Sequence, residues 1–390
     1  MIWVIAIMLF LLGLSYFTSG RNIFSPGVLT TAVFSFCLLS FALLPHPLPD
    51  LHRQCLLGIG LWGSCFTLSV LFMQSFHYTP VQATCSVAVR DVYFWISLLC
   101  IPLLIRFAHL AITTGTSDSI AYNLRDAAIN GLNGSKKAYS PFYYGLWVAT
   151  YLLYLKDISK EKWFRAIVTG GLVLAFGIVT MSKTLILNFG IMTLFVLFWR
   201  KKITTKHILI GLAVLIVFLV FIQVIRYSLT VDEENMSSMF ELYILRNFNA
   251  FDTLKPCSAE HFGEHVFRLY YAVTYKLGLS SIEPISPILP WVYTPVITNT
   301  YTVLYPFFLD FGYTGIGIFA ILLGSGMGWI YAHHREGEEI FTLLYAYFCV
   351  LLVTQYNGEA FFTNLAGHIK FVILLFIPYI KIKLPAKNVP

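Results

Sequence analysis

The chain has 390 residues, of which 58% are hydrophobic and only 12% are charged, and its mean hydropathy is +0.74. Soluble domains carry roughly 25% charged residues, so this composition excludes an ordinary soluble protein and indicates a polytopic membrane protein. The net charge of +7 fits basic cytoplasmic loops and anionic lipid. It does not indicate nucleic acid as a partner, because the sequence has no basic stripe with interleaved aromatic residues.

Apolar runs close to 20 residues long recur along the chain and predict an all-α protein with about eleven transmembrane helices. Residues 1–390 are expected to form a single polytopic membrane domain. In chain order, the predicted spans are 2–19, 24–44, 54–74, 92–112, 141–155, 165–181, 184–199, 207–226, 311–332, 340–356 and 365–380. The first run is interpreted as a retained helix and not as a cleaved signal, because no basic residue precedes it.

Lysine and arginine residues in short loops predict the orientation. The 156–165 and 200–206 loops each carry four such residues, so both are predicted to be cytoplasmic. Alternation of the spans then places the amino terminus in the periplasm and the carboxyl terminus in the cytoplasm. The long 227–300 segment falls on the periplasmic side. No internal repeat is visible, which disfavours an inverted-repeat transporter.

Between about residues 226 and 302 the apolar runs stop, and this stretch holds eight of the chain's 19 acidic residues. The capping-box spacing of residues 238–241 predicts a helix that continues towards Phe251. The four-residue spacing of Glu260, Glu264 and Arg268 predicts a second helix. Four prolines exclude a continuous helix across 284–295, so this part is expected to be extended or interfacial.

The segment 299–315 leads from this loop into the predicted ninth span and carries Asp310 where that span enters the bilayer, among tyrosines and phenylalanines. An acid at this place is a candidate for chemistry at the membrane surface. The structural alternative is an aromatic belt with glycines for close helix packing, of which Gly324-x-x-x-Gly328 is an example. Physical reasoning leaves these two interpretations equally favoured.

A second polar group, Glu359 and His368, lies near the outer ends of the last two predicted spans. An ionisable residue close to hydrocarbon is a functional candidate. The alternatives are that Glu359 caps a helix and that His368 makes an interhelical hydrogen bond. Function is favoured for Glu359, and the two interpretations are balanced for His368.

Several cations are predicted on the outer face, against the usual preference of basic residues for the cytoplasmic side. Lys183 is the most informative, because it lies in a short turn between two apolar spans. Cations can hold the oxygens of a pyrophosphate leaving group. The alternative for any single residue is a surface ion pair or a lipid headgroup contact. The candidates are Arg125, Lys183, Arg226, Arg246 and Arg268.

His261 and His265 have a spacing that can bind zinc on a helix, but no third ligand is evident and no metal or other cofactor is expected. The seven cysteines show no metal or disulfide spacing. The sequence also lacks a phosphate-binding glycine loop, a dinucleotide fingerprint and a Gly-x-Ser-x-Gly motif. Any sugar substrate is therefore expected to arrive attached to lipid.

Two blocks of the sequence resemble a known family. The block from Asn299 to Gly315, with Asn299-x-Tyr301-Thr302 and Asp310-x-Gly312, and the block Asn357-Gly358-Glu359-Ala360-Phe361-Phe362-Thr363-Asn364 are similar to segments of the bacterial O-antigen (lipopolysaccharide repeat-unit) polymerases, the Wzy family. The predicted topology, with one dominant periplasmic loop late in the chain, is similar over the whole length.

This resemblance implies a multi-pass glycosyltransferase of the bacterial inner membrane that needs no metal. It would transfer a growing glycan from undecaprenyl pyrophosphate onto a new lipid-linked repeat unit. A flippase and a chain-length regulator would be its partners. The resemblance implies that Glu359 is the first choice as catalytic base, with His368 and Asp310 as alternatives. The expected substrate-binding residues are the five cations together with Asn299, Tyr301, Tyr305 and Trp291. Trp291, Tyr301 and Tyr305, together with Tyr293, are expected to stack on the faces of sugar rings.

Three rival functions remain open. A plain structural or scaffold protein is the first, although it would not need an intramembrane Glu359 and His368. An O-antigen ligase shares the architecture, and such enzymes use a histidine of the periplasmic loop, a role that His261 or His265 could fill. A flippase for lipid-linked oligosaccharides would need a cationic cavity at mid-membrane, whereas Arg106, Lys183 and Lys370 all lie towards the outer ends of predicted spans.

Overall fold

The computed structural model describes residues 1–80, 83–131, 141–157, 163–227, 244–286, 288–294 and 296–380. These residues are predominantly helical, which confirms the predicted fold class at that level. The chain divides into two compact units. Unit 1 comprises residues 1–80, 232–337 and 347–368, and unit 2 comprises 81–231, 338–346 and 369–390.

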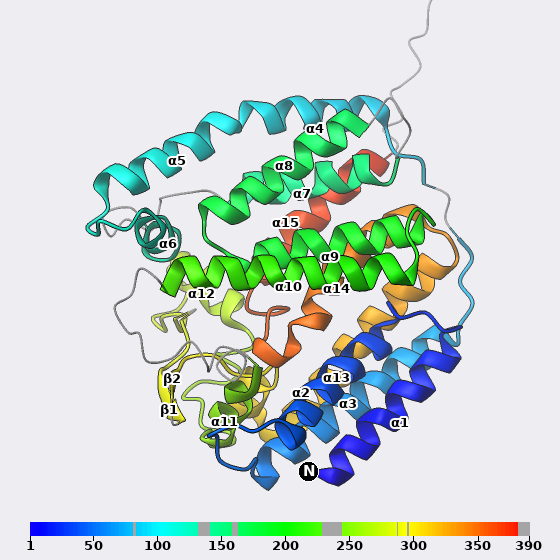
Figure 1. The fold of residues 1–390 in the computed structure, drawn as a ribbon, viewed down its shortest axis with the longest axis vertical. Helices are drawn as coiled ribbons and strands as arrows, with labels where there is room; N and C mark the ends of the chain where they lie inside the picture. The colour runs from blue at the N-terminus through cyan, green and yellow to red at the C-terminus, as the bar shows by residue number, and fades with distance from the viewer. Residues whose placement is uncertain are drawn as a thin grey trace, which may run out of the picture. The chain divides into compact units, whose positions relative to one another are not determined.

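Unit 1 is built on four helices that run side by side in Figure 1: α1 (Ile2–Thr18), α2 (Pro26–Leu43), α3 (Arg53–Gln74) and α13 (Tyr305–Arg335). The closest approach is between α3 and α13. A Cβ atom added at Gly324 would lie 2.5 Å from the carbonyl oxygen of Phe66, and one at Gly328 would lie 2.9 Å from that of Val70. These short distances confirm the predicted close packing at Gly324 and Gly328. A larger side chain at either position would force the backbones of α3 and α13 apart.

The smaller elements of unit 1 gather beside these helices. They are α11 (Arg246–Asp252), α12 (Arg268–Lys276), the strands β1 (Val292–Thr294) and β2 (Val296–Thr298), and the 3-10 helix η3 (Gln355–Asn357). The two strands pair antiparallel, with Tyr293 opposite Ile297. Helices α14 (Glu339–Val353) and α15 (Leu365–Phe376) each run from one unit into the other.

Asp252 at the end of α11 fixes the start of α3. Its carboxylate, 4% exposed, accepts hydrogen bonds from the backbone N–H groups of His52 at 2.7 Å and Cys55 at 2.9 Å. The first N–H groups of a helix have no acceptor within the helix. The buried carboxylate of Asp252 supplies the hydrogen-bond acceptor that no side chain of α3 provides. Burial raises the pKa of Asp252 despite these hydrogen bonds.

Unit 2 holds α4 (Val87–Leu99), α5 (Ile101–Thr114), α6 (Ile120–Asn130), α7 (Pro141–Leu155), α8 (Trp163–Val179), α9 (Lys183–Trp199), α10 (Thr205–Tyr227) and the 3-10 helix η4 (Ile377–Tyr379). Charged groups link several helix ends within it. Arg90 pairs with Asp157 at 2.9 Å, and Lys156 pairs with Glu339. Residues predicted on the cytoplasmic side, such as Arg90 and Lys156, are therefore held by carboxylates.

Among the described residues, four helical segments are long and apolar enough to cross a membrane: Pro26–Leu43, Arg53–Gln74, Val87–Thr114 and Tyr305–Arg335. Shorter apolar helices occupy most of the other predicted spans, and the total of about eleven stays a prediction. The predicted span 92–112 is interrupted at Cys100, between α4 and α5. Pro102 explains the break, because it has no N–H to donate to the preceding turn.

Two local predictions for the polar segment have different outcomes. The extended conformation expected across 284–295 is confirmed at its described positions, which include β1. The predicted helix through Glu260, Glu264 and Arg268 is wrong, because residues 261–267 form turns and α12 begins only at Arg268. Gly263 has a φ of 64°, which interrupts a helix there. The capping box at 238–241 lies outside the described residues.

Candidate active site

The site begins with a break in α13. Gly312 has φ 61° and ψ −148°, so the first turns of α13 are not continuous with the rest of the helix. A break of this kind leaves carbonyl oxygens of the preceding turn without their helical donors. The loop before α12 supplies replacements, since Cys257 N–H donates to Phe308 at 3.1 Å and Ala259 N–H donates to Leu309 at 3.3 Å. The loop is thereby fixed beside Asp310.

Asp310 points into this loop, and its side chain is fully buried, with 0% exposure. Its carboxylate accepts hydrogen bonds from the backbone N–H of Val266 at 2.9 Å and from that of His265 at 3.2 Å. A buried carboxylate is tolerated only when hydrogen-bond donors surround it. These donors also explain the missing helix, because N–H groups that a helix would use are bonded to Asp310 instead.

His265 completes the pair. Its ring nitrogen Nδ1 lies 2.7 Å from Oδ1 of Asp310. Because a carboxylate accepts, the neutral imidazole carries its proton on Nδ1, and Nε2 on the other side of the ring keeps its lone pair. The ring of Tyr305 meets that of His265 edge-on, with the centroids 5.7 Å apart. A carboxylate that orients and polarises a histidine is the arrangement of a general base.

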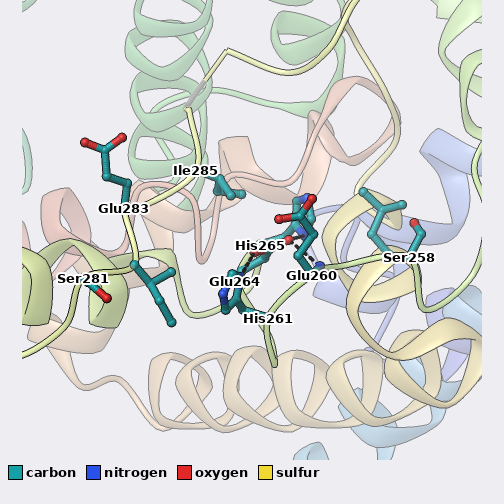
Figure 2. Close-up of a pocket in the computed structure, with 10 residues that line it drawn as sticks. Ser258, Glu260, His261, Glu264, His265, Ser281, Glu283 and Ile285 are labelled. Carbon is teal, nitrogen blue, oxygen red and sulfur yellow. Dashed lines mark hydrogen bonds and ion pairs between the residues drawn. The ribbon is translucent and has the colours of Figure 1, made fainter.

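His265 lines a cavity of about 650 Å³. Figure 2 shows His265, His261, Glu264 and Glu260 gathered in one group, with Glu283 extending away from it. Glu264 links the group, because its carboxylate lies 3.2 Å from Nδ1 of His261 and accepts the N–H of Glu260 at 3.0 Å. The cavity lining within the described chain contains no lysine or arginine. Its polar surface therefore suits hydroxyl groups better than phosphate.

The predicted helical spacing of His261 and His265 is lost in the turns. The His261 ring lies 3.2 Å from Glu264, whereas the His265 ring is bonded to Asp310 at 2.7 Å and lies 4.0 Å from Glu264. Across the residues that the structure describes, no group of three His, Cys, Asp or Glu side chains is arranged to hold a metal ion.

Two of the predicted cations, Arg268 and Arg246, belong to unit 1. Each donates a hydrogen bond to a backbone carbonyl, Arg268 beside the cavity and Arg246 at strand β2. Arg268 donates from Nε to Ile285 at 2.8 Å, and Ile285 lines the cavity. Burial lowers the pKa of Arg268. Arg246 donates to Ile297 of β2 at 3.2 Å. The remaining cations, Arg125 in α6, Lys183 at the start of α9 and Arg226 in α10, belong to unit 2.

The predicted sugar-stacking residues divide into buried and exposed ones. Tyr301 and Tyr305 are 2% and 4% exposed, and their rings pack together with centroids 4.5 Å apart. Burial raises the pKa of Tyr301, whose hydroxyl donates to Pro290 at 3.0 Å. Trp291 and Tyr293 are instead exposed. Only the exposed pair can stack on a sugar without rearrangement, whereas Tyr305 packs against His265 and Tyr301 packs against Tyr305.

The side chain of Asn247 links the two blocks that carry the family resemblance. No sequence pattern predicts this role for Asn247. Its side chain is buried in α11. It accepts a hydrogen bond from the Thr300 hydroxyl at 2.5 Å and donates to Asn357 at 3.1 Å. Asn299, next to Thr300, is half-buried. The block before α13 and the block after α14 are thus tied together through one amide.

Glu359 closes a turn. One carboxylate oxygen accepts the backbone N–H groups of Phe361 at 2.6 Å and Phe362 at 2.9 Å, and the other accepts both the N–H and the hydroxyl of Thr363 at 2.9 Å. Burial nevertheless raises the pKa of Glu359. Both oxygens are occupied by local donors, which favours the capping interpretation of this residue.

His368 is held between two groups of unit 1. Its Nδ1 lies 3.1 Å from the hydroxyl of Tyr347, and its Nε2 lies 2.7 Å from the carbonyl oxygen of Ala360. Both ring nitrogens therefore have partners. This geometry favours the interpretation of His368 as an interhelical hydrogen bonder, whereas His261 and His265 line the cavity and only His265 of these two is bonded to Asp310.

No protein-family model, no curated protein and no solved structure matches this chain.

Proposed function

We propose that this protein is a membrane-embedded glycosyltransferase that polymerises lipid-linked repeat units, as the resemblance to O-antigen polymerases implies. The observation that carries the proposal is the His265–Asp310 pair, which combines a hydrogen bond of 2.7 Å with a position on the wall of a cavity of about 650 Å³. This arrangement supports His265 as the catalytic base in preference to Glu359, because both carboxylate oxygens of Glu359 are used within its own turn.

The chemistry is a single displacement. Nε2 of His265 accepts the proton of an acceptor sugar hydroxyl, and that oxygen attacks the anomeric carbon of the donor glycan. The bond from this carbon to the pyrophosphate breaks, and undecaprenyl pyrophosphate leaves with the bonding electrons. Asp310 stabilises the imidazolium that forms and acts as a positioning residue. The cavity binds the acceptor glycan, because hydroxyl groups can donate to Glu260 and Glu264.

The donor pyrophosphate is assigned to arginine. Arg268 is the first choice, since its contact with Ile285 places it beside the cavity wall, and Arg246 is the second. A guanidinium fork matches phosphate oxygens and offsets the charge that develops on the leaving group. Arg125, Lys183 and Arg226 remain proposals from the sequence. Trp291 and Tyr293 supply exposed aromatic faces for sugar rings.

The remaining details rest on the sequence. The proposal includes about eleven spans, a periplasmic segment 227–300 and a location in the bacterial inner membrane with a periplasmic amino terminus. A flippase would deliver the lipid-linked units, and a chain-length regulator would be a partner. The apolar helices of both units support a membrane location in general.

An O-antigen ligase is the second candidate function, and the position of His265 supports this candidate as well. Ligases of this architecture use a histidine of the periplasmic loop, and His265 lies in the corresponding segment. The two functions differ in acceptor, because a ligase transfers the finished glycan to lipid A-core.

A lipopolysaccharide gel separates the candidates. A deletion strain should show core capped with a single repeat unit and no ladder, and the wild-type gene should restore the ladder. Bare core without a capped band would indicate a ligase or a flippase. An unchanged ladder would contradict the proposal in a strain whose only polymeric surface glycan is this lipopolysaccharide.

A further inference from the structure

Helix α12 presents an apolar face that the described residues of unit 1 leave exposed. Tyr270, Val273 and Leu277 are 65%, 47% and 67% exposed, and their spacing puts them on one side of the helix. The opposite side is anchored, because Tyr271 is 9% exposed and its hydroxyl donates to the carbonyl of Phe262 at 2.8 Å. The helix is therefore fixed in place with its apolar face outward.

Large apolar side chains are also exposed on both flanks of α12. Phe262, three residues before His265, is 78% exposed, and Leu279, just past the end of the helix, is 74% exposed. Water-facing loops rarely expose so many large apolar side chains within 20 residues. The segment lies in the middle of the stretch whose polar composition predicts a loop in water.

This apolar surface joins the side of a candidate membrane span. The ring of Phe262 meets that of Phe311 with centroids 5.2 Å apart, and the ring of Phe267 meets that of Phe319 at 6.3 Å. Phe319 lies well inside the apolar helix α13. Ile318 and Leu322, which lie before and after Phe319 in α13, are 50% and 56% exposed. The uncovered face of α12 thus adjoins a helix side that suits lipid.

We propose that α12 and its flanking residues form an interfacial anchor that lies in the outer surface of the lipid bilayer. Its apolar face enters the boundary between headgroups and acyl chains, and the exposed Lys276 at its carboxyl end meets anionic phosphate groups. Tyrosine side chains suit this depth, because the ring is apolar and the hydroxyl stays hydrated.

The anchor sets the depth of the candidate active site. His261 directly precedes the exposed Phe262, and His265 lies two residues before the exposed Phe267, so the cavity that both histidines line opens at the level of the headgroups. A substrate whose pyrophosphate joins a membrane-bound chain to a glycan presents its reacting bond at this level. The anchor itself follows from the exposed residues and does not depend on the proposed reaction.

Photocrosslinking tests the proposal on the full-length protein. The purified chain carries p-benzoyl-L-phenylalanine at one position and is reconstituted into vesicles of phosphatidylethanolamine and phosphatidylglycerol with an alkyne on one acyl chain. Test positions are Tyr270 and Leu277, and the matched controls are the exposed polar positions Lys255 and Asp50 of the same unit. Replacement at Tyr270 keeps an aromatic ring, so at least one test variant should fold.

We expect several-fold more lipid adduct at Tyr270 and Leu277 than at the two controls in protein that elutes as a single species. Equal adduct at test and control positions would overturn the proposal. Crosslinks between two copies of the chain at Leu277, in place of lipid adducts, would also overturn it and assign the face to a dimer. Neither result affects the dependence of the lipopolysaccharide ladder on His265, which tests the proposed reaction separately.

Discussion

Replacing Gly312 with alanine should destabilise unit 1 through the backbone and not through lost contacts. The φ of 61° with ψ of −148° lies in a region that residues with a Cβ atom avoid, at a cost of about 1–3 kcal/mol. The new Cβ would also lie 3.2 Å from Sγ of Cys257. A loss of about 2 kcal/mol lowers the ratio of folded to unfolded protein roughly 30-fold. Equilibrium unfolding of the purified chain in mixed micelles, followed by tryptophan fluorescence, measures this change.

Gly326 is the matched control in the same helix. An added Cβ there meets nothing within 4 Å, and its φ is not positive. Gly326→Ala should therefore leave the free energy of unfolding unchanged or raise it by up to about 1 kcal/mol, because alanine favours helix. Equal destabilisation of the two variants would refute the argument that α13 is broken at Gly312.

Three further changes have defined outcomes. Asp310→Asn should lower the polymerisation rate by roughly 10²–10⁴-fold at unchanged protein level, because the amide no longer fixes the histidine tautomer; a rate within threefold of wild type would contradict this. Burial raises the pKa of Glu359 above 4.5, so the folded state binds its proton more tightly. Wild-type stability should then fall as pH rises from 4.5 through the raised pKa, and Glu359→Gln should reduce this slope in unfolding measured at pH 4.5–8. Asp252→Ala should cost about 0.5–2 kcal/mol in thermal unfolding, because the N–H groups of His52 and Cys55 lose their acceptor; an unchanged midpoint would exclude a capping role.

The features predictable from sequence are those set by local pattern. Apolar runs predict the helices, and Gly324 and Gly328 predict the close approach to α3, because small residues four apart form a groove whatever the partner is. The prolines before Trp291 exclude a helix there for an equally local reason. Asp310 could be singled out because an acid among aromatic residues needs a partner.

The partner of Asp310 could not be predicted, because it lies 45 residues away in the chain. The spacing of His261 and His265 is compatible with a zinc pair on a helix, and it does not indicate a carboxylate partner for either ring. The turns around His265 are stabilised because the carboxylate of Asp310 accepts their backbone N–H groups. Local sequence preferences therefore do not predict these turns. Burial of Tyr301 is likewise a tertiary property, which is why its expected stacking on sugars does not fit its surroundings.

The most direct test of the central claim is polymerisation in vitro by the purified protein, with lipid-linked repeat units extracted from the deletion strain. Wild type and His261→Ala should both extend the units into a ladder, whereas His265→Ala should leave them as single units at equal protein concentration and with an unchanged gel-filtration profile. Extension by His265→Ala at the wild-type rate would contradict the assignment of His265 as the base.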